Sequence, residues 1–185
     1  GLRIRFMLTD VPELANLPWE YLYDPVHDQY LCLSVQTPVV RSLDLARRIL
    51  PLTTEPPLRI LTMISAPGDL PPLDVETEWA KLREALAELQ ERGQIVLERL
   101  EQATLPRLQA KLRRGSFHVF HYMGHGTFDQ DAQDGMLILE DDRGRSHAVS
   151  SQVMGTLLHD EPLLRLAVLN ACEGAVASRE APFAG

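Results

Sequence analysis

The 185-residue sequence has few of the residues that characterise disulfide-stabilised or membrane-spanning proteins. It contains only two cysteines, Cys32 and Cys172, which is too few for the disulfide framework of a small secreted protein. It has no apolar run long enough to cross a bilayer and no signal-peptide pattern. We therefore expect a protein of the reducing cytoplasm that makes no membrane contact and keeps its thiols free. Cys32 lies in an apolar segment and is predicted to pack there.

Basic residues are also scarce relative to acidic ones. Lys and Arg together number 18 against 26 Asp and Glu, which gives a formal net charge of −8. A surface that binds a phosphate backbone needs a basic patch, and a short basic cluster such as Arg113-Arg114 is explained by a helix end. The composition therefore predicts no nucleic-acid contact by this domain. A hydrophobic content of 45% is enough to bury a sizeable core.

Pro56-Pro57 marks a change in the sequence pattern. Residues 1–55 are predicted to form an N-terminal segment of strands and a short helix, with a half-exposed strand at the start and extended chain over 31–40. Because the sequence starts in the middle of this strand pattern, which covers residues 2–8, we expect the true beginning of the chain to lie upstream. In residues 56–185, strand and helix patterns alternate as in a parallel α/β sheet with helices on both faces. We predict strands over 58–64, 95–100, 117–123, 136–140, 147–149 and from 166, with helices over 74–92, 104–114 and 150–158.

Residues 166–175 read Leu-Ala-Val-Leu-Asn-Ala-Cys-Glu-Gly-Ala. The apolar half is typical of a strand buried in a parallel sheet, and the chain then breaks abruptly into Asn170, Cys172 and Gly174. Ligands of open α/β sheets bind at the carboxyl ends of the strands, so Cys172 is predicted to lie at a functional edge. A single cysteine after a strand is most often a small buried hydrophobe, so this motif alone does not establish a functional role for Cys172.

A second motif provides an imidazole at the same edge. Residues 117–126 form another apolar strand that ends in a Gly-flanked histidine, His125, which we place on a loop held open by Gly124 and Gly126. A metal site formed by His118, His121 and His125 is disfavoured, because His118 and His121 would point to opposite faces of a strand.

The three acidic residues after His125 have the chemistry of calcium ligands, but their spacing does not fit the EF-hand calcium loop. The segment lacks the Gly and Glu that an EF-hand loop requires at fixed positions. A solvated acidic loop is the better interpretation, and the sequence predicts neither a metal nor a cofactor. The three carboxylates concerned are Asp129, Asp131 and Asp134.

Three blocks of the sequence resemble the CHAT domain of the caspase-like cysteine peptidases, the group that includes caspases, separase, legumain, clostripain and gingipain. They are residues 17–24 followed by 37–41, the histidine motif at 121–126 and the cysteine motif at 169–175. His125 precedes Cys172 by 47 residues, close to the roughly 50 residues found in caspases. The resemblance covers nearly the whole chain. It implies a three-layer caspase-like fold with a small β-hairpin insertion between the two catalytic motifs, and a further strand and helix after Gly185.

The resemblance also implies a function. His125 and Cys172 would form a catalytic dyad without a third residue, and the backbone N–H groups of Gly126 and Cys172 would form the oxyanion hole. Such domains are typically bacterial effectors that cleave a protein target when a neighbouring sensor or partner module switches them on. Two alternatives remain open at this point: a catalytically inactive interaction or regulatory module, and a cysteine hydrolase of another substrate, such as an amidase.

The substrate pocket of this group lies beside the cysteine motif. An acidic lining is easier to assemble from this sequence than a basic one, because the only nearby cation, Arg179, lies some distance beyond the cysteine. We therefore predict cleavage after a basic or small residue rather than after aspartate. The candidate pocket residues are Asn170, Glu173, Asp129, Asp131 and Asp134.

Overall fold

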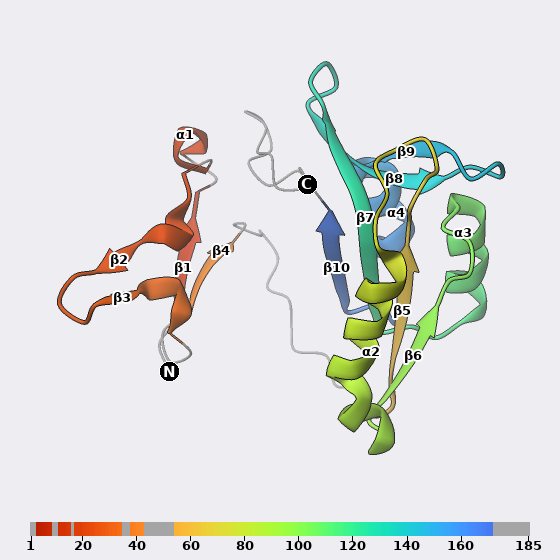
Figure 1. Ribbon diagram of the computed structural model, residues 1–185, viewed down its shortest axis with the longest axis horizontal. Helices are drawn as coiled ribbons and strands as arrows, with labels where there is room; N and C mark the ends of the chain where they lie inside the picture. The colour runs from red at the N-terminus through yellow and green to blue at the C-terminus, as the bar shows by residue number, and fades with distance from the viewer. Residues whose placement is uncertain (1–2, 9–10, 16, 35–37, 43–53, 172–185) are drawn as a thin grey trace. The chain divides into compact units, whose positions relative to one another are not determined.

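The computed structural model describes residues 3–8, 11–15, 17–34, 38–42 and 54–171 of the chain (Figure 1). These residues fall into two compact units, one within residues 1–50 and the other within 51–174. The division of the chain into an N-terminal segment and an α/β core at residue 55 stays a prediction.

The first unit contains a small parallel sheet in which β1 (Ile4–Met7) pairs with β4 (Val39–Ser42). Exposure alternates along β1, which agrees with the apolar and charged alternation of its sequence. The prediction of extended chain over 31–40 is wrong for its first three residues, because Leu31–Leu33 form the 3-10 helix η2. Cys32 lies in this helix and is half-buried. The remaining elements are α1 (Pro12–Ala15), η1 (Trp19–Tyr21), β2 (Tyr23–Asp24) and β3 (Gln29–Tyr30).

The second unit is built on a mostly parallel central sheet. Its parallel strands are β6, β5, β7 and β10 in spatial order, and β8 and β9 extend the sheet in antiparallel fashion from the far end of β7. The predicted α/β class and parallel core are therefore confirmed. The strands span Leu58–Ile64 (β5), Ile95–Arg99 (β6), Val119–Asp129 (β7), Asp134–Glu140 (β8), Ser146–Ser150 (β9) and Leu166–Ala171 (β10).

Three helices of the second unit complete the layers: α2 (Val75–Glu91), α3 (Leu105–Arg114) and α4 (Ser151–His159). Each begins at a residue whose side chain accepts a hydrogen bond from the first turn, and these residues are Asp74, Thr104 and Ser150. Figure 1 shows α2 in front of the sheet and α4 behind it. The helices therefore cover both faces, as a three-layer fold requires.

The main hydrophobic core lies between the sheet and the helices α3 and α4. Alternate residues of β5 and β7 point to this side, including the fully buried Leu61, Phe120 and Tyr122. Leu108 of α3 and Met154 of α4 pack against them. Each such side chain contributes about 1.5–3 kcal/mol relative to exposure to water, so this core fixes the carboxyl ends of β5 and β7.

Strand β7 continues further than the sequence predicts. Its first half pairs with β5 and β10, whereas from His125 onward it pairs with β8 in a hairpin. The prediction that His125 lies on a loop is therefore wrong, because the residue lies inside strand β7. The acidic segment after it is an ordered hairpin end, in which Asp129 Oδ1 accepts hydrogen bonds from the N–H groups of Asp131 and Ala132 at 2.9 and 3.0 Å.

Candidate active site

His125 lies where β7 passes from its parallel neighbours to β8. Its ring nitrogen Nε2 is 2.9 Å from the carbonyl oxygen of Pro71, in the segment between β5 and α2. A carbonyl oxygen can only accept a hydrogen bond, so Nε2 must carry the proton. In the neutral ring Nδ1 is then the basic nitrogen. The Pro71 carbonyl thus fixes both the orientation and the tautomer of the imidazole.

The sequence does not reveal this third group. The partner of His125 is a main-chain oxygen, which any residue type can supply, so no side-chain pattern marks it. The available signal was positional, because the Pro- and Gly-rich segment 66–73 follows β5 at the sheet edge where His125 lies. A neutral carbonyl orients the ring but stabilises an imidazolium less than a carboxylate would.

The backbone at His125 is held from beneath by Tyr122. The ring of Tyr122 is completely buried, and its hydroxyl group donates to the carbonyl oxygens of His125 and Ile138 at 2.9 and 2.8 Å. Burial raises the pKa of Tyr122 well above its ordinary value, so the hydroxyl stays protonated and remains a donor. This contact joins the first half of β7 to the hairpin.

Gly124 is required by the close approach of this tyrosine. A Cβ atom at position 124 would overlap the Tyr122 hydroxyl group and lie 3.1 Å from the carbonyl oxygen of Ser65. The glycine before His125 therefore makes room for a buried side chain, rather than opening a loop as the sequence suggested.

Strand β10 brings the cysteine motif to this point. Asn170 is the register partner of Met123, and Ala171 is the register partner of Gly124. Asn170 is exposed and shares with Met123 the sheet face that bears His125. Cys172 and Glu173 lie outside the described residues, and so does the backbone N–H group predicted for the oxyanion hole at Cys172.

The protein-family model of the CHAT domain matches residues 2–182. The chain belongs to the CHAT domain family. This family is part of the caspase-like cysteine peptidase superfamily, and the mostly parallel sheet with helices on both faces agrees with its fold. A search of curated proteins found no match to the chain.

The other predicted oxyanion donor of this CHAT domain, the N–H group of Gly126, belongs to a residue within β7. Gly126 follows His125 directly and is the register partner of Leu137 in β8. Its position in a paired strand fixes the backbone next to the imidazole. The role of this N–H group stays a prediction.

The acidic pocket residues of the CHAT domain have structural contacts of their own. Asp129 and Asp134 are register partners that close the hairpin, and Asp134 accepts a hydrogen bond from the hydroxyl of Ser151 at the start of α4. Asp131 is exposed beyond them. Asp129 lies four residues beyond His125, about 13 Å at the usual rise per residue of a strand. Their part in a substrate pocket stays a prediction.

Two other histidines lie near His125 in the sequence: His118 immediately precedes β7, and His121 lies within it. The Nδ1 atom of His118 accepts a hydrogen bond from the backbone N–H of Arg59 at 2.9 Å. His121 is half-buried, and this burial lowers its pKa. Within the described parts of the chain, no group of three His, Cys, Asp or Glu side chains is arranged to hold a metal ion. No described helix is both long and apolar enough to cross a bilayer.

Proposed function

We propose that this CHAT domain is a cysteine endopeptidase in which His125 and Cys172 form the catalytic dyad. The observation that carries the proposal is the hydrogen bond from His125 Nε2 to the Pro71 carbonyl, because it leaves Nδ1 as the base. The register supports the pairing, since Gly124 and Ala171 lie side by side and precede His125 and Cys172 in the sequence. Cys172 directly follows Ala171 in the sequence, and Ala171 is the last residue of the strand that pairs with the histidine-bearing strand β7.

In the proposed reaction, Cys172 Sγ transfers its proton to His125 Nδ1 and bonds to the carbonyl carbon of the scissile peptide. The resulting oxyanion accepts hydrogen bonds from the N–H groups of Gly126 and Cys172. As the carbon–nitrogen bond breaks, the leaving amine takes the proton from Nδ1. Water then gives a proton to Nδ1 and attacks the thioester, which releases the acid and restores the thiol.

The Pro71 carbonyl supports every step of this sequence. The proton on Nε2 stays in its hydrogen bond to Pro71 while Nδ1 gains and loses a proton. The ring therefore keeps one orientation through acylation and hydrolysis, which preserves the geometry that proton transfer requires. Heteronuclear NMR of the histidine side chains, assigned with His125→Ala, should show the proton of neutral His125 on Nε2.

The proposed biological role is that of an effector that cleaves a protein target when a neighbouring sensor or partner module activates it. This role comes from the resemblance to CHAT domains of the caspase-like group. The substrate and the activating partner would both be proteins.

A thiol-reactive peptide probe tests the enzymatic proposal. We expect it to label the activated protein at Cys172, with labelling lost in Cys172→Ala and strongly slowed in His125→Ala. Cys32→Ala, which removes the other cysteine, is the matched control and should be labelled normally. Undiminished peptide cleavage by Cys172→Ala would overturn the dyad. An activated protein that neither binds the probe nor cleaves would support the inactive interaction module, and cleavage of small amides without peptides would support the amidase.

A further inference from the structure

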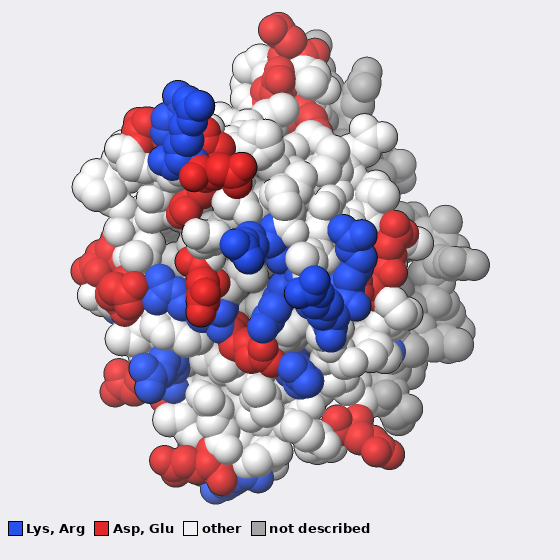
Figure 2. Space-filling view, turned by 90° about the vertical axis from the view of Figure 1, so that its right-hand side faces the viewer, with Lys and Arg blue, Asp and Glu red and all other residues white. Residues whose placement is uncertain are grey.

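A hollow of about 410 Å³ lies between β6 and α3, in the unit built on the central sheet. Figure 2 shows Lys and Arg side chains gathered on the face of the molecule where α3 lies. Four cations line the hollow against a single carboxylate, although the whole chain carries a net charge of −8. Its lining residues are Arg99, Leu100, Glu101, Gln102, Arg107, Ala110, Lys111 and Arg114.

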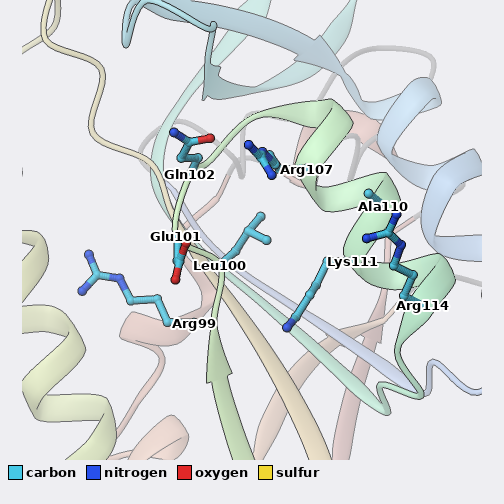
Figure 3. A pocket seen from close by; sticks show the side chains of 8 residues that line it. All are labelled: Arg99, Leu100, Glu101, Gln102, Arg107, Ala110, Lys111 and Arg114. Carbon is cyan, nitrogen blue, oxygen red and sulfur yellow. The ribbon is translucent and has the colours of Figure 1, made fainter.

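Three of the cations come from one stripe of α3. Arg107, Lys111 and Arg114 are spaced by four and three residues, so they lie on the same side of the helix. Figure 3 shows these three side chains along α3, with Arg99 on the other side of the hollow. Of the Arg113-Arg114 pair noted in the sequence, Arg114 lines the hollow and Arg113 does not.

Two of the four cations already have partners. Arg99 forms an ion pair with Glu76 at 2.9 Å, and Lys111 forms one with Glu98 at 2.8 Å. Arg107 and Arg114 have no ion-pair or hydrogen-bond partner for their side chains among the described residues. Both are exposed. The hollow therefore presents two guanidinium groups that are free to bind an anion.

The charge of α3 is not explained by the helix itself. The helix contains no acidic residue, so its like charges at four-residue and three-residue spacing repel one another. Arg107 also lies in the first turn, where the helix dipole disfavours a cation. Cations in the last turn, such as Arg114, suit the dipole, but Arg107 costs stability without a compensating contact in the described chain.

We propose that this hollow is a docking site for an acidic segment of a partner protein. Guanidinium groups match carboxylates in geometry and form paired hydrogen bonds with them. Arg107 and Arg114 are separated by about 10 Å along the helix axis, which is the length of about three residues of extended chain. A single short peptide with several carboxylates therefore reaches both arginines, and Leu100 and Ala110 offer small apolar contacts between them.

The surroundings favour a peptide over nucleic acid or a small molecule. A phosphate backbone needs a continuous basic track, whereas Glu101 lies within the hollow and the chain is acidic as a whole. Small-molecule pockets are lined mainly by apolar side chains, and this lining is mostly charged or polar. The hollow lies at β6, which is separated from β7 and its His125 by β5. It is therefore distinct from the proposed active site.

Fluorescence anisotropy with a labelled peptide of repeating Glu-Glu-Ala tests the proposal on the intact chain. The double variant Arg107→Gln/Arg114→Gln should weaken binding about tenfold or more, corresponding to about 1.4 kcal/mol. The control Arg83→Gln/Arg113→Gln removes the same charge from exposed positions outside the hollow, one of them on α3, and should change the affinity less than about twofold. Thermal melting should show that all three proteins are fully folded at the temperature of the binding assay.

Three results would overturn the docking site. The first is no binding of the acidic peptide by the unaltered chain. The second is an equal loss of affinity in the double variant and its control, which would indicate attraction by net charge alone. The third is displacement of the peptide by oligothymidylate that binds more tightly through the same arginines, which would assign the hollow to nucleic acid.

Discussion

The hydroxyl group of Tyr122 donates a hydrogen bond to the carbonyl oxygen of His125, three residues further along the same strand, at 2.9 Å. The same hydroxyl lies 2.8 Å from the carbonyl oxygen of Ile138, the residue that pairs with His125 across the hairpin. A buried side chain of the hydrophobic core therefore holds the main chain of the proposed catalytic histidine and its hairpin partner. Stability and catalysis are expected to depend on it together.

The first prediction is that Tyr122→Phe lowers both stability and activity. The variant keeps the ring and its packing but leaves two carbonyl oxygens with one donor fewer, which should cost about 1–3 kcal/mol. Urea unfolding measures the loss of stability. Catalysis by the activated protein should fall mainly in kcat, because the histidine backbone is less well held.

Tyr21→Phe is the matched control for this change. Tyr21 is 74% exposed, so removal of its hydroxyl should leave unfolding and kcat unchanged within error. Wild-type kcat in Tyr122→Phe, despite a lower stability, would show that the hydroxyl serves the core alone.

The second prediction concerns Gly124. A methyl group at this position overlaps the Tyr122 hydroxyl and approaches the Ser65 carbonyl, so Gly124→Ala should destabilise the domain by about 2 kcal/mol or more. Gly155→Ala is the control, because Gly155 lies within α4 and a Cβ there has no atom within 4 Å. That change should stabilise the protein by about 0.5–1 kcal/mol.

A double-mutant cycle separates the causes of the Gly124 effect. Tyr122→Phe removes the nearer of the two overlapping atoms, the hydroxyl oxygen, and leaves the ring carbon Cζ at 2.7 Å from the added Cβ. Because part of the overlap is removed, the two destabilising effects should combine to less than their sum. Strict additivity would show that the tyrosine hydroxyl is not what excludes a side chain at position 124.

The sequence predicted best those elements whose signals are local. The strand β5 and the helices α2, α3 and α4 follow from apolar periodicity, and each helix begins after a residue type that commonly caps helices, Asp74, Thr104 or Ser150. These features depend on residues close together in the sequence, so their prediction requires no tertiary contacts.

The features that the sequence did not reveal depend on distant contacts. Gly-His-Gly at 124–126 resembles a loop, yet β8 pairs with this stretch and extends β7 through it. The main-chain partner of His125 at Pro71 lies 54 residues away and leaves no mark in side-chain identity. The basic hollow likewise forms only when β6 brings Arg99 beside α3.

The third prediction is a pH dependence of stability that originates at Glu98. Its carboxylate binds Lys111 and Arg59. Both contacts lower the pKa of Glu98 below its unfolded value of 4.5, and the contact with Lys111 has the larger effect. The stabilisation is therefore fully present above that value and is lost as the pH falls through the folded pKa. Between about pH 6 and pH 3, the free energy of unfolding should fall less steeply in Glu98→Gln than in the unaltered chain.

Glu91→Gln serves as the control for Glu98. Glu91 is exposed at the end of α2 and forms no ion pair within the described residues. Its variant should follow the pH profile of the unaltered protein. Identical slopes for Glu98→Gln and the unaltered chain would show that the Glu98 ion pairs contribute nothing to acid sensitivity.

The last prediction concerns the residue that the proposed peptidase accepts before the scissile bond. Residues 119–140, which include His125 and the hairpin beyond it, contain no Lys or Arg but carry Asp129, Asp131 and Asp134. Recognition of a substrate aspartate needs a cation in the pocket, whereas this surface favours the approach of a basic segment. A positional-scanning peptide library on the activated protein should therefore show a preference for Arg, Lys or small residues. Asp131→Asn, which leaves the hairpin hydrogen bonds intact, should reduce kcat/KM for the arginine peptide about twofold at low salt. A clear preference for aspartate before the cleaved bond would contradict the acidic pocket and leave Asp129 and Asp134 with their structural role alone.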